Sequence, residues 1–163
     1  MRDIVIIAHN IRSTHNVGAF FRTADGFGIS KIIFSGYTPY PTLEDDTRLP
    51  HFADKITRQI HKTALGAETM VPFERYELPP ITELKTAGYT IVGLEQDKRS
   101  IMLPDYQVPD KVALFLGNEI DGIYPEYREQ CDALIEIPMQ GGKESFNVSV
   151  AAGIAMYHLA TAT

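Results

Sequence analysis

The chain has 163 residues, of which 44% are hydrophobic and 22% are charged, the composition of an ordinary globular protein. Its formal net charge is −6 at pH 7, which counts against a protein that binds nucleic acid by general phosphate neutralisation. We therefore expect residues 1–163 to form a single domain in which any contact with a polyanion is confined to a local basic patch.

Cysteine content and hydropathy indicate where the protein works. A single cysteine, Cys131, excludes an intramolecular disulfide and favours a reducing cytosol. No apolar stretch approaches the length of a membrane span, and no basic segment followed by an apolar run opens the chain. The sequence predicts a cytoplasmic protein that makes no membrane contact.

Short apolar runs alternate with helical patterns, which predicts βα units and an α/β fold with a mostly parallel sheet flanked by helices. The expected strands cover residues 3–8, 31–35, 89–95, 112–116 and 133–137. The expected helices cover residues 17–27, part of 53–65, 80–87, 124–131 and 146–160. A Pro-rich loop that begins at Tyr37 is a candidate substrate-facing element.

The first polar cluster lies in residues 10–24, where it follows the first expected strand and opens a helix. Three arginines and two histidines lie in the first 22 residues against a single acidic residue, so positive charge is concentrated here. The turn contributes one glycine, Gly18, and lacks the G-x-G-x-x-G pattern of dinucleotide-binding proteins. An NAD-type enzyme and an ordinary Rossmann methyltransferase are therefore disfavoured.

Two further polar clusters follow apolar strands near the C-terminus. Leu116-Gly117-Asn118-Glu119 ends one strand, and Ile137-Pro138-Met139 ends the next, because proline cannot extend a central strand. Ser145-Phe146-Asn147-Val148-Ser149 then begins a helix that Ser145 or Asn147 can cap. Since open α/β sheets bind ligands at the carboxyl ends of their strands, these clusters predict a ligand site.

Metal and thiolate chemistry find little support. The five histidines show no metal-ligand spacing, and one cysteine cannot build a zinc cluster, so we expect no metal. Cys131 follows an expected helix among acidic residues, which would raise the pKa of its thiol and disfavours a thiolate nucleophile.

Together the three clusters resemble the SpoU/TrmH family, RNA methyltransferases of the SPOUT class. The motifs stand in the family's order: Asn-x-Gly at residues 16–18 with an arginine four residues past the glycine, then Leu-Gly-Asn-Glu, then Ile-Pro-Met with the Ser-x-Asn-Val-Ser helix start. The resemblance runs from about Asn10 to about Ala155. It implies a SPOUT-type fold with a C-terminal trefoil knot, S-adenosyl-L-methionine as cofactor, and a homodimer that methylates a ribose 2′-hydroxyl in tRNA or rRNA.

The resemblance also implies site residues. The cofactor would contact Gly117, Ile137 and Phe146, with Leu94, Glu95, Asn118 and Met139 nearby. Phe146 replaces the leucine more usual at this position of the family. The matching catalytic positions are Asn16, Arg22, Glu119, Ser145 and Asn147. Because a guanidinium keeps its proton to above about pH 12, Arg22 would grip a phosphate and stabilise the developing oxyanion, leaving the phosphate or Glu119 as proton acceptor.

Each of these residues also has a simpler explanation. Ile137 and Phe146 would be core residues, Asn16 a helix cap, Arg22 a solvated helix charge and Glu119 a turn acid. The small residues of helix 146–160 would pack on the chain's own sheet or, as the resemblance implies, against a second chain. This stripe comprises Val148, Ala151, Ala152, Ala155 and Leu159.

Two alternatives to an RNA methyltransferase remain. One is a non-catalytic knotted protein that holds the cofactor or RNA, and the other is a dinucleotide-binding enzyme. We expect no separate N-terminal RNA-binding domain of the kind that many members of the family carry. Recognition of the RNA would then come from the catalytic domain itself or from a partner protein.

Overall fold

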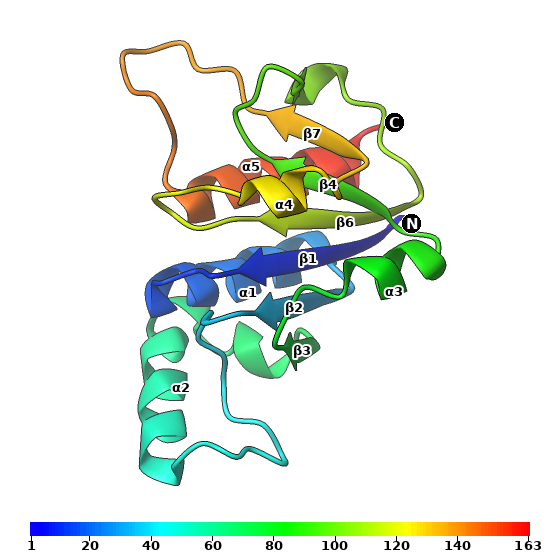
Figure 1. Cartoon of the computed structure of the whole chain (residues 1–163). Helices are drawn as coiled ribbons and strands as arrows, with labels where there is room; N and C mark the ends of the chain where they lie inside the picture. The colour runs from blue at the N-terminus through cyan, green and yellow to red at the C-terminus, as the bar shows by residue number, and fades with distance from the viewer.

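A computed structural model describes residues 1–163, and its seven strands form one sheet in the order β3-β2-β1-β6-β4-β7-β5. Every neighbouring pair is parallel, which confirms the predicted α/β fold (Figure 1). The strands are β1 (Asp3–His9), β2 (Lys31–Ser35), β3 (Phe73–Tyr76), β4 (Thr90–Leu94), β5 (Ile101–Met102), β6 (Lys111–Leu116) and β7 (Ala133–Glu136).

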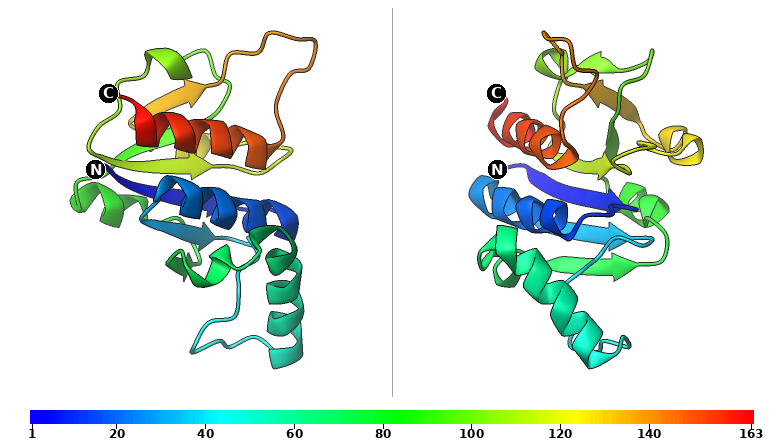
Figure 2. Two further views of the ribbon diagram at one scale, coloured as in Figure 1. Left: turned by 180° about the vertical axis from the view of Figure 1, so that it is seen from behind. Right: turned by 90° about the vertical axis from the view of Figure 1, so that its left-hand side faces the viewer.

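Helices cover both faces of the sheet. Figure 2 shows α1 and α5 on one face and α3 and α4 on the other, while α2 extends away from the sheet beside the loop that follows β2. The helices are α1 (Thr14–Phe27), α2 (Pro50–Ala64), α3 (Ile81–Thr86), α4 (Pro125–Arg128) and α5 (Val148–Thr161). None of them is both long enough and apolar enough to cross a lipid bilayer.

Strand β1 shows why the sheet is covered on both faces. Ile4, Ile6 and Ala8 belong to the core beneath α1 and α5, while Val5 and Ile7 belong to the smaller core on the opposite face. Successive side chains of a strand point to opposite faces, so a continuous apolar run buries both. All five side chains are buried.

Two strands were not predicted. In β3, Glu74 and Arg75 interrupt the apolar pattern, and none of its four residues is fully buried, as suits the edge of the sheet. Strand β5 has only two residues, both exposed, and lies at the other edge. Neither segment carries the hydrophobic pattern by which an interior strand is recognised.

Helix boundaries also differ from the prediction. Helix α1 begins at Thr14, because Ser13 caps it by accepting a hydrogen bond from the N–H of Asn16 at 3.2 Å. Helix α5 begins at Val148, after the cap Asn147. Helix α4 ends at Arg128, shorter than the expected 124–131.

Candidate functional site at the carboxyl ends of β4, β6 and β7

A cavity of about 300 Å³ lies where β4, β6 and β7 end. We call its two sides the first wall, residues 116–122 after β6, and the second wall, residues 136–148 between β7 and α5. All seven residues that the sequence analysis associated with the cofactor line this cavity: Leu94, Glu95, Gly117, Asn118, Ile137, Met139 and Phe146. The structure thus brings them together, and their contact with a cofactor stays a prediction.

The first wall is a tight turn that requires glycine. A Cβ atom placed on Gly117 would lie 2.4 Å from the carbonyl group of Gly122, and Gly122 itself has a φ of +67°. Asn118 and Gly122 form an isolated antiparallel bridge across the turn. Gly117 therefore does more than change the chain direction, because it allows two backbone segments to approach within a distance that any side chain would prevent.

Asn118 connects this turn to the N-terminal part of the chain. Its Nδ2 donates hydrogen bonds to the carbonyl oxygen of Asn10 at 3.0 Å and to the hydroxyl of Tyr37 at 2.8 Å. Its Oδ1 accepts from the N–H groups of Ile120 and Asp121 at 2.8 and 2.9 Å. The side chain is buried, and these four bonds occupy both ends of its amide. Asn118 therefore holds the wall of the cavity in place.

Glu119 makes the same kind of connection to the start of α1. Its carboxylate accepts from the N–H of Arg12 at 3.0 Å, from the N–H of Ser13 at 3.2 Å and from Nδ2 of Asn16 at 3.1 Å. Burial alone would raise the pKa of Glu119, but the hydrogen bonds, led by that of Arg12, outweigh it and lower the pKa below its ordinary value. A carboxylate held in its charged form is a poor proton acceptor, so the structure favours a positioning role for Glu119.

Ser145 and Asn147 lie together at the start of α5 with different surroundings. Ser145 is exposed and lines the cavity. Oδ1 of Asn147 accepts hydrogen bonds from the N–H and the hydroxyl of Ser149, at 2.9 and 2.6 Å. Capping of this helix is thus confirmed for Asn147. The simpler explanation of Asn16 as a cap is wrong, since Ser13 caps α1.

Arg22 is the candidate that the fold leaves apart. It lies on α1 with its side chain exposed, and it is not among the residues that line the cavity. It forms no ion pair within the chain. Of the catalytic candidates, Glu119 and Ser145 line the cavity and Asn16 is bonded to Glu119, whereas one chain alone does not bring Arg22 there.

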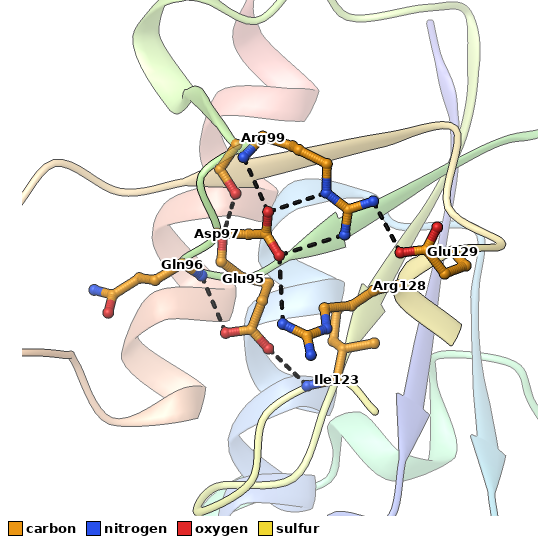
Figure 3. A network of polar contacts seen from close by, with 8 residues as sticks. Glu95, Gln96, Asp97, Arg99, Ile123, Arg128 and Glu129 are labelled. Atoms are coloured by element: carbon orange, nitrogen blue, oxygen red, sulfur yellow. Dashed lines mark hydrogen bonds and ion pairs between the residues drawn. The ribbon is translucent and has the colours of Figure 1, made fainter. Parts of the chain in front are cut away.

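A polar network that the sequence analysis missed supports the β4 side of the cavity (Figure 3). Glu95 accepts from the N–H of Ile123 at 2.7 Å, and Asp97 pairs with Arg99 at 3.1 Å and with Arg128 at 3.3 Å. Hydrogen bonds from Arg99 lower the pKa of Asp97 to about 2. The sequence signal for this network was an acidic residue two positions before an arginine, Asp97 and Arg99. The network attaches residues 95–99 to the segment around α4.

The structure brings together neither a metal-binding site nor a reactive thiol. The chain holds no group of three or more His, Cys, Asp or Glu side chains placed to bind a metal ion. Burial, and after it the charge of Asp132, raises the pKa of Cys131 to about 11. The expected direction of this shift is confirmed, with burial as its larger cause, and the thiol stays protonated at neutral pH.

The chain is similar in sequence to known RNA methyltransferases. It is 29% identical over 156 residues to a tRNA (guanosine(18)-2′-O)-methyltransferase of Aquifex aeolicus, covering 96% of this chain and 68% of that protein. It is 33% identical over 158 residues to the 23S rRNA (guanosine-2′-O-)-methyltransferase RlmB of Neisseria meningitidis, covering 94% of this chain but only 56% of that protein. The chain thus spans just over half of the second relative.

Solved structures of similar proteins have the same fold. The crystal structure of the A. aeolicus TrmH/SpoU tRNA modifying enzyme superposes with a TM-score of 0.79 at 27% identity, covering 98% of this chain and 75% of that one. An AdoMet-bound rRNA methyltransferase from Sinorhizobium meliloti, at 24% identity and a TM-score of 0.77, shares the fold over 98% of this chain and 56% of that one. The model of the SpoU rRNA Methylase family matches residues 3–157. The chain therefore belongs to the SpoU family, whose motifs meet at this cavity.

Proposed function

We propose that the protein transfers a methyl group from S-adenosyl-L-methionine to a ribose 2′-hydroxyl of tRNA or rRNA. The observation that carries the proposal is the meeting of three motifs around one cavity, with Asn16 bonded to Glu119 and with Gly117 and Ile137 in its walls. The family and the names of the similar proteins support it.

The cavity suits a cationic ligand with an apolar part. Five carboxylates and no lysine, arginine or histidine line it, which favours a sulfonium and an ammonium group over a pyrophosphate. Ile137, Met139 and Phe146 supply an apolar surface for an adenine ring. When bound, S-adenosylmethionine supplies an electrophilic methyl group. The residues fit this cofactor better than they fit NAD.

The chain's own residues would position the RNA. Glu119 fixes the backbone of Arg12 and Ser13 and the amide of Asn16, so that these groups face a substrate in one arrangement. Ser145, exposed at the cavity, is free to hydrogen-bond the ribose. Arg22 would grip a phosphate and stabilise the developing 2′-oxyanion, and the phosphate is a better proton acceptor than Glu119.

Because Arg22 of the same chain does not line the cavity, we propose that a second copy of the chain brings its own Arg22 there, in a homodimer. The outer surface of α5 is apolar, with Val150 and Tyr157 50% and 57% exposed. The ring of Tyr157 packs against Phe27 of α1, so the apolar surface continues onto that helix. We propose this outer face as the dimer interface.

The interface expected from the sequence was a different one. Ala152, Ala155 and Leu159 are fully buried within the chain, so this stripe packs on the chain's own sheet. Substitution of Ala152 by arginine would therefore unfold the chain instead of separating a dimer. Val150→Arg tests the outer face: light scattering should show a monomer with an unchanged unfolding temperature. Thr82→Arg, on α3 at the opposite face, is the control and should leave a dimer.

Three finer features belong to the proposal. The family resemblance implies that residues 1–163 form one SPOUT domain with the C-terminal third tied in a trefoil knot, and the single cysteine favours the cytoplasm. The knot is compatible with a cavity whose walls are the two segments that follow β6 and β7. We expect a knot to add a slow refolding phase, which double-jump refolding kinetics can distinguish from proline isomerisation.

Two measurements test the function. Calorimetry should show S-adenosylmethionine or its demethylated product binding at roughly micromolar strength without added metal, and no binding of NAD. Mass mapping of ribose methylation in total tRNA and rRNA, from cells with and without the gene, should identify the modified nucleotide. Tight NAD binding would overturn the proposal, and cofactor binding without any lost methylation would favour the non-catalytic alternative.

Arg22 separates chemistry from binding. Arg22→Ala should leave the fold and cofactor affinity nearly intact and lower single-turnover methylation by roughly 10²-fold or more. Arg22→Lys should rescue little, because lysine keeps the charge but loses the planar fork that matches a phosphate. Near-normal rates in Arg22→Ala would show that Arg22 is only a solvated charge on the helix.

A further inference from the structure

A second hollow lies between α2, the loop that follows β2 and the start of α1. Its lining includes the aromatic side chains of Tyr37, Tyr40 and Phe52 together with Arg12. Tyr37 and Phe52 are 57% and 48% exposed, and exposed rings gathered at one hollow are typical of an interaction surface. We call this hollow the α2 groove.

Beside the groove, α2 carries a row of cations. Lys55, Arg58 and Lys62 are spaced three and four residues apart, so they share one side of the helix, and all three are exposed. None of them takes part in an ion pair, whereas Arg48 and Arg75 in the groove pair with Asp46 and Glu77. We call these three residues the α2 cations.

This local charge contrasts with the rest of the protein. The chain as a whole carries −6, and α2 contains a single acidic residue, Asp54. Three unpaired cations on one side of a helix repel one another unless an anion faces them. Charge complementarity therefore points to a polyanion, and the exposed rings beside the cations point to one whose bases are accessible.

Hydrogen bonds join the wall of the groove to the wall of the cavity at the strand ends. The hydroxyl of Tyr37, in the groove, accepts a hydrogen bond from Asn118, in the cavity wall, at 2.8 Å. The N–H of Arg12, also in the groove, donates to Glu119 in the cavity wall at 3.0 Å. Figure 1 shows α2, the start of α1 and the segment after β7 at the same edge of the sheet.

We propose that the α2 groove and the α2 cations bind an unpaired stretch of the RNA substrate beside the nucleotide that enters the cavity. Phosphates lie along Lys55, Arg58 and Lys62, and one or more bases stack on Phe52 and Tyr37. Unpaired RNA fits because base faces are hidden inside a duplex and available in loops. The inference rests on the proposed function and adds where and in what form the RNA is held.

The salt dependence of binding tests the cations. The probe is a short, unstructured, fluorescently labelled RNA of mixed sequence, measured by anisotropy at several salt concentrations. Lys55→Gln, Arg58→Gln and Lys62→Gln should each weaken binding several-fold at low salt and reduce the slope of log K against log salt by about 0.7, the value for one phosphate contact on a single strand. Lys98→Gln is the matched control, exposed and unpaired near the other edge of the sheet, and it should change neither quantity.

A second pair of variants tests the stacking of bases. Phe52→Ala should weaken binding of the single-stranded probe by about 5- to 100-fold, the loss expected for one stacked base. Leu49→Ala removes a side chain that is 66% exposed next to the same helix but lies outside the groove, and it should have no effect. A duplex RNA of equal length should bind the unsubstituted protein more weakly than the single strand.

The outcomes distinguish this inference from the proposed function. If the α2 variants bind and react like Lys98→Gln while the unsubstituted protein methylates RNA, the inference is wrong and the function stands. If the α2 cations carry RNA binding but no RNA is methylated, the inference stands and the function is wrong. Equal binding of duplex and single strand would remove the stacking role. Calorimetry with S-adenosylmethionine should give the same affinity for every variant.

Discussion

In the first wall of the cavity, after β6, several hydrogen bonds hold Asn118 and Glu119, while the second wall, before α5, is largely exposed. Asn118 and Glu119 each accept or donate several hydrogen bonds to residues near the start of the chain. Residues 140–147 are exposed throughout, and their connections to the rest of the chain are one hydrogen bond from Gln96 and the cap at Asn147. The two walls thus differ in how much order remains to be gained when a ligand binds.

This difference separates two tasks. The first wall positions Arg12, Ser13 and Asn16 before any ligand arrives, so no ordering cost falls on the binding step. The second wall carries Phe146, an expected contact of the cofactor, on an exposed segment with few bonds, whereas Ile137, next to β7, packs against the core. We infer that the substrate side of the site is preorganised and the cofactor side is ordered on binding.

The two walls should differ most in the stability that is lost when a glycine is substituted. Gly117→Ala places a Cβ 2.4 Å from backbone atoms of Gly122, and because backbone cannot move aside as a side chain can, we expect a loss of about 3 kcal/mol or more. Gly141→Ala, in the second wall, meets nothing within 4 Å and should be neutral or slightly stabilising. Thermal unfolding of both variants measures the contrast. Equal losses would mean that the second wall is as tightly packed as the first.

The glutamate of the first wall should show a smaller, pH-dependent effect. Glu119→Gln places an NH₂ group where N–H donors converge, and we expect a loss of about 1–3 kcal/mol at neutral pH. The folded pKa of Glu119 lies below its ordinary value near 4.5. Its contribution to stability is therefore complete above that value and is lost as the pH falls through the folded pKa.

Chemical denaturation of both proteins between neutral pH and about pH 3 checks the sign. The difference in unfolding free energy between the native protein and Glu119→Gln should shrink toward acid, in the range where the native carboxylate takes up its proton. Glu144→Gln, on the exposed second wall, is the control, and its difference should stay small across the range. A constant difference for Glu119→Gln would contradict the lowered pKa.

The sequence predicted the interior of the sheet and the composition of the cavity well. Continuous apolar runs such as residues 3–8 identify strands buried on both faces, and polar residues directly after them mark the strand ends. The role of Glu119 was beyond such reasoning, because its partners lie more than a hundred residues away in the chain. The α2 cations were not predicted as a binding site either, because a helical row of lysines and arginines is common on solvated surfaces.

Residue spacing on a helix left two interpretations of the sequence undecided. Small residues on α5 suit both packing on a sheet and packing on another chain, and spacing alone does not distinguish the two. The buried Ala152 and the exposed Val150 became distinguishable only in the fold. Arg22 shares a motif with Asn16, and its catalytic role stays a prediction, because its exposed side chain does not line the cavity of its own chain.

The cap at the end of the second wall should matter less than Glu119. Asn147→Ala removes the acceptor for the N–H of Ser149 at the start of α5, and loss of such a cap costs about 1 kcal/mol. Asn147→Asp keeps the acceptor and should restore most of the stability. If Asn147→Asp recovers stability but not methylation, the amide has a further role in catalysis. Full activity in Asn147→Ala would remove the residue from the catalytic set.

The weakest expected effect concerns the hydrogen bond that holds the second wall to β4. Nε2 of Gln96 donates to the carbonyl oxygen of Glu144 at 2.5 Å across an exposed segment. Gln96→Ala should leave the unfolding temperature nearly unchanged, because an exposed hydrogen bond contributes little to the net stability. It should, however, weaken binding of S-adenosylmethionine a few-fold, since a freer segment must be ordered at greater cost when the cofactor binds.

Gln140→Ala provides the comparison for this variant, because Gln140 is exposed in the same segment and forms no hydrogen bond that holds the wall. Calorimetry of the two variants should therefore separate them although their unfolding curves coincide. A heat-capacity change on binding that is larger for Gln96→Ala than for the native protein would show the additional ordering directly. Identical affinities would indicate that the second wall is already ordered in the free protein, and the proposed contrast between the two walls would be lost.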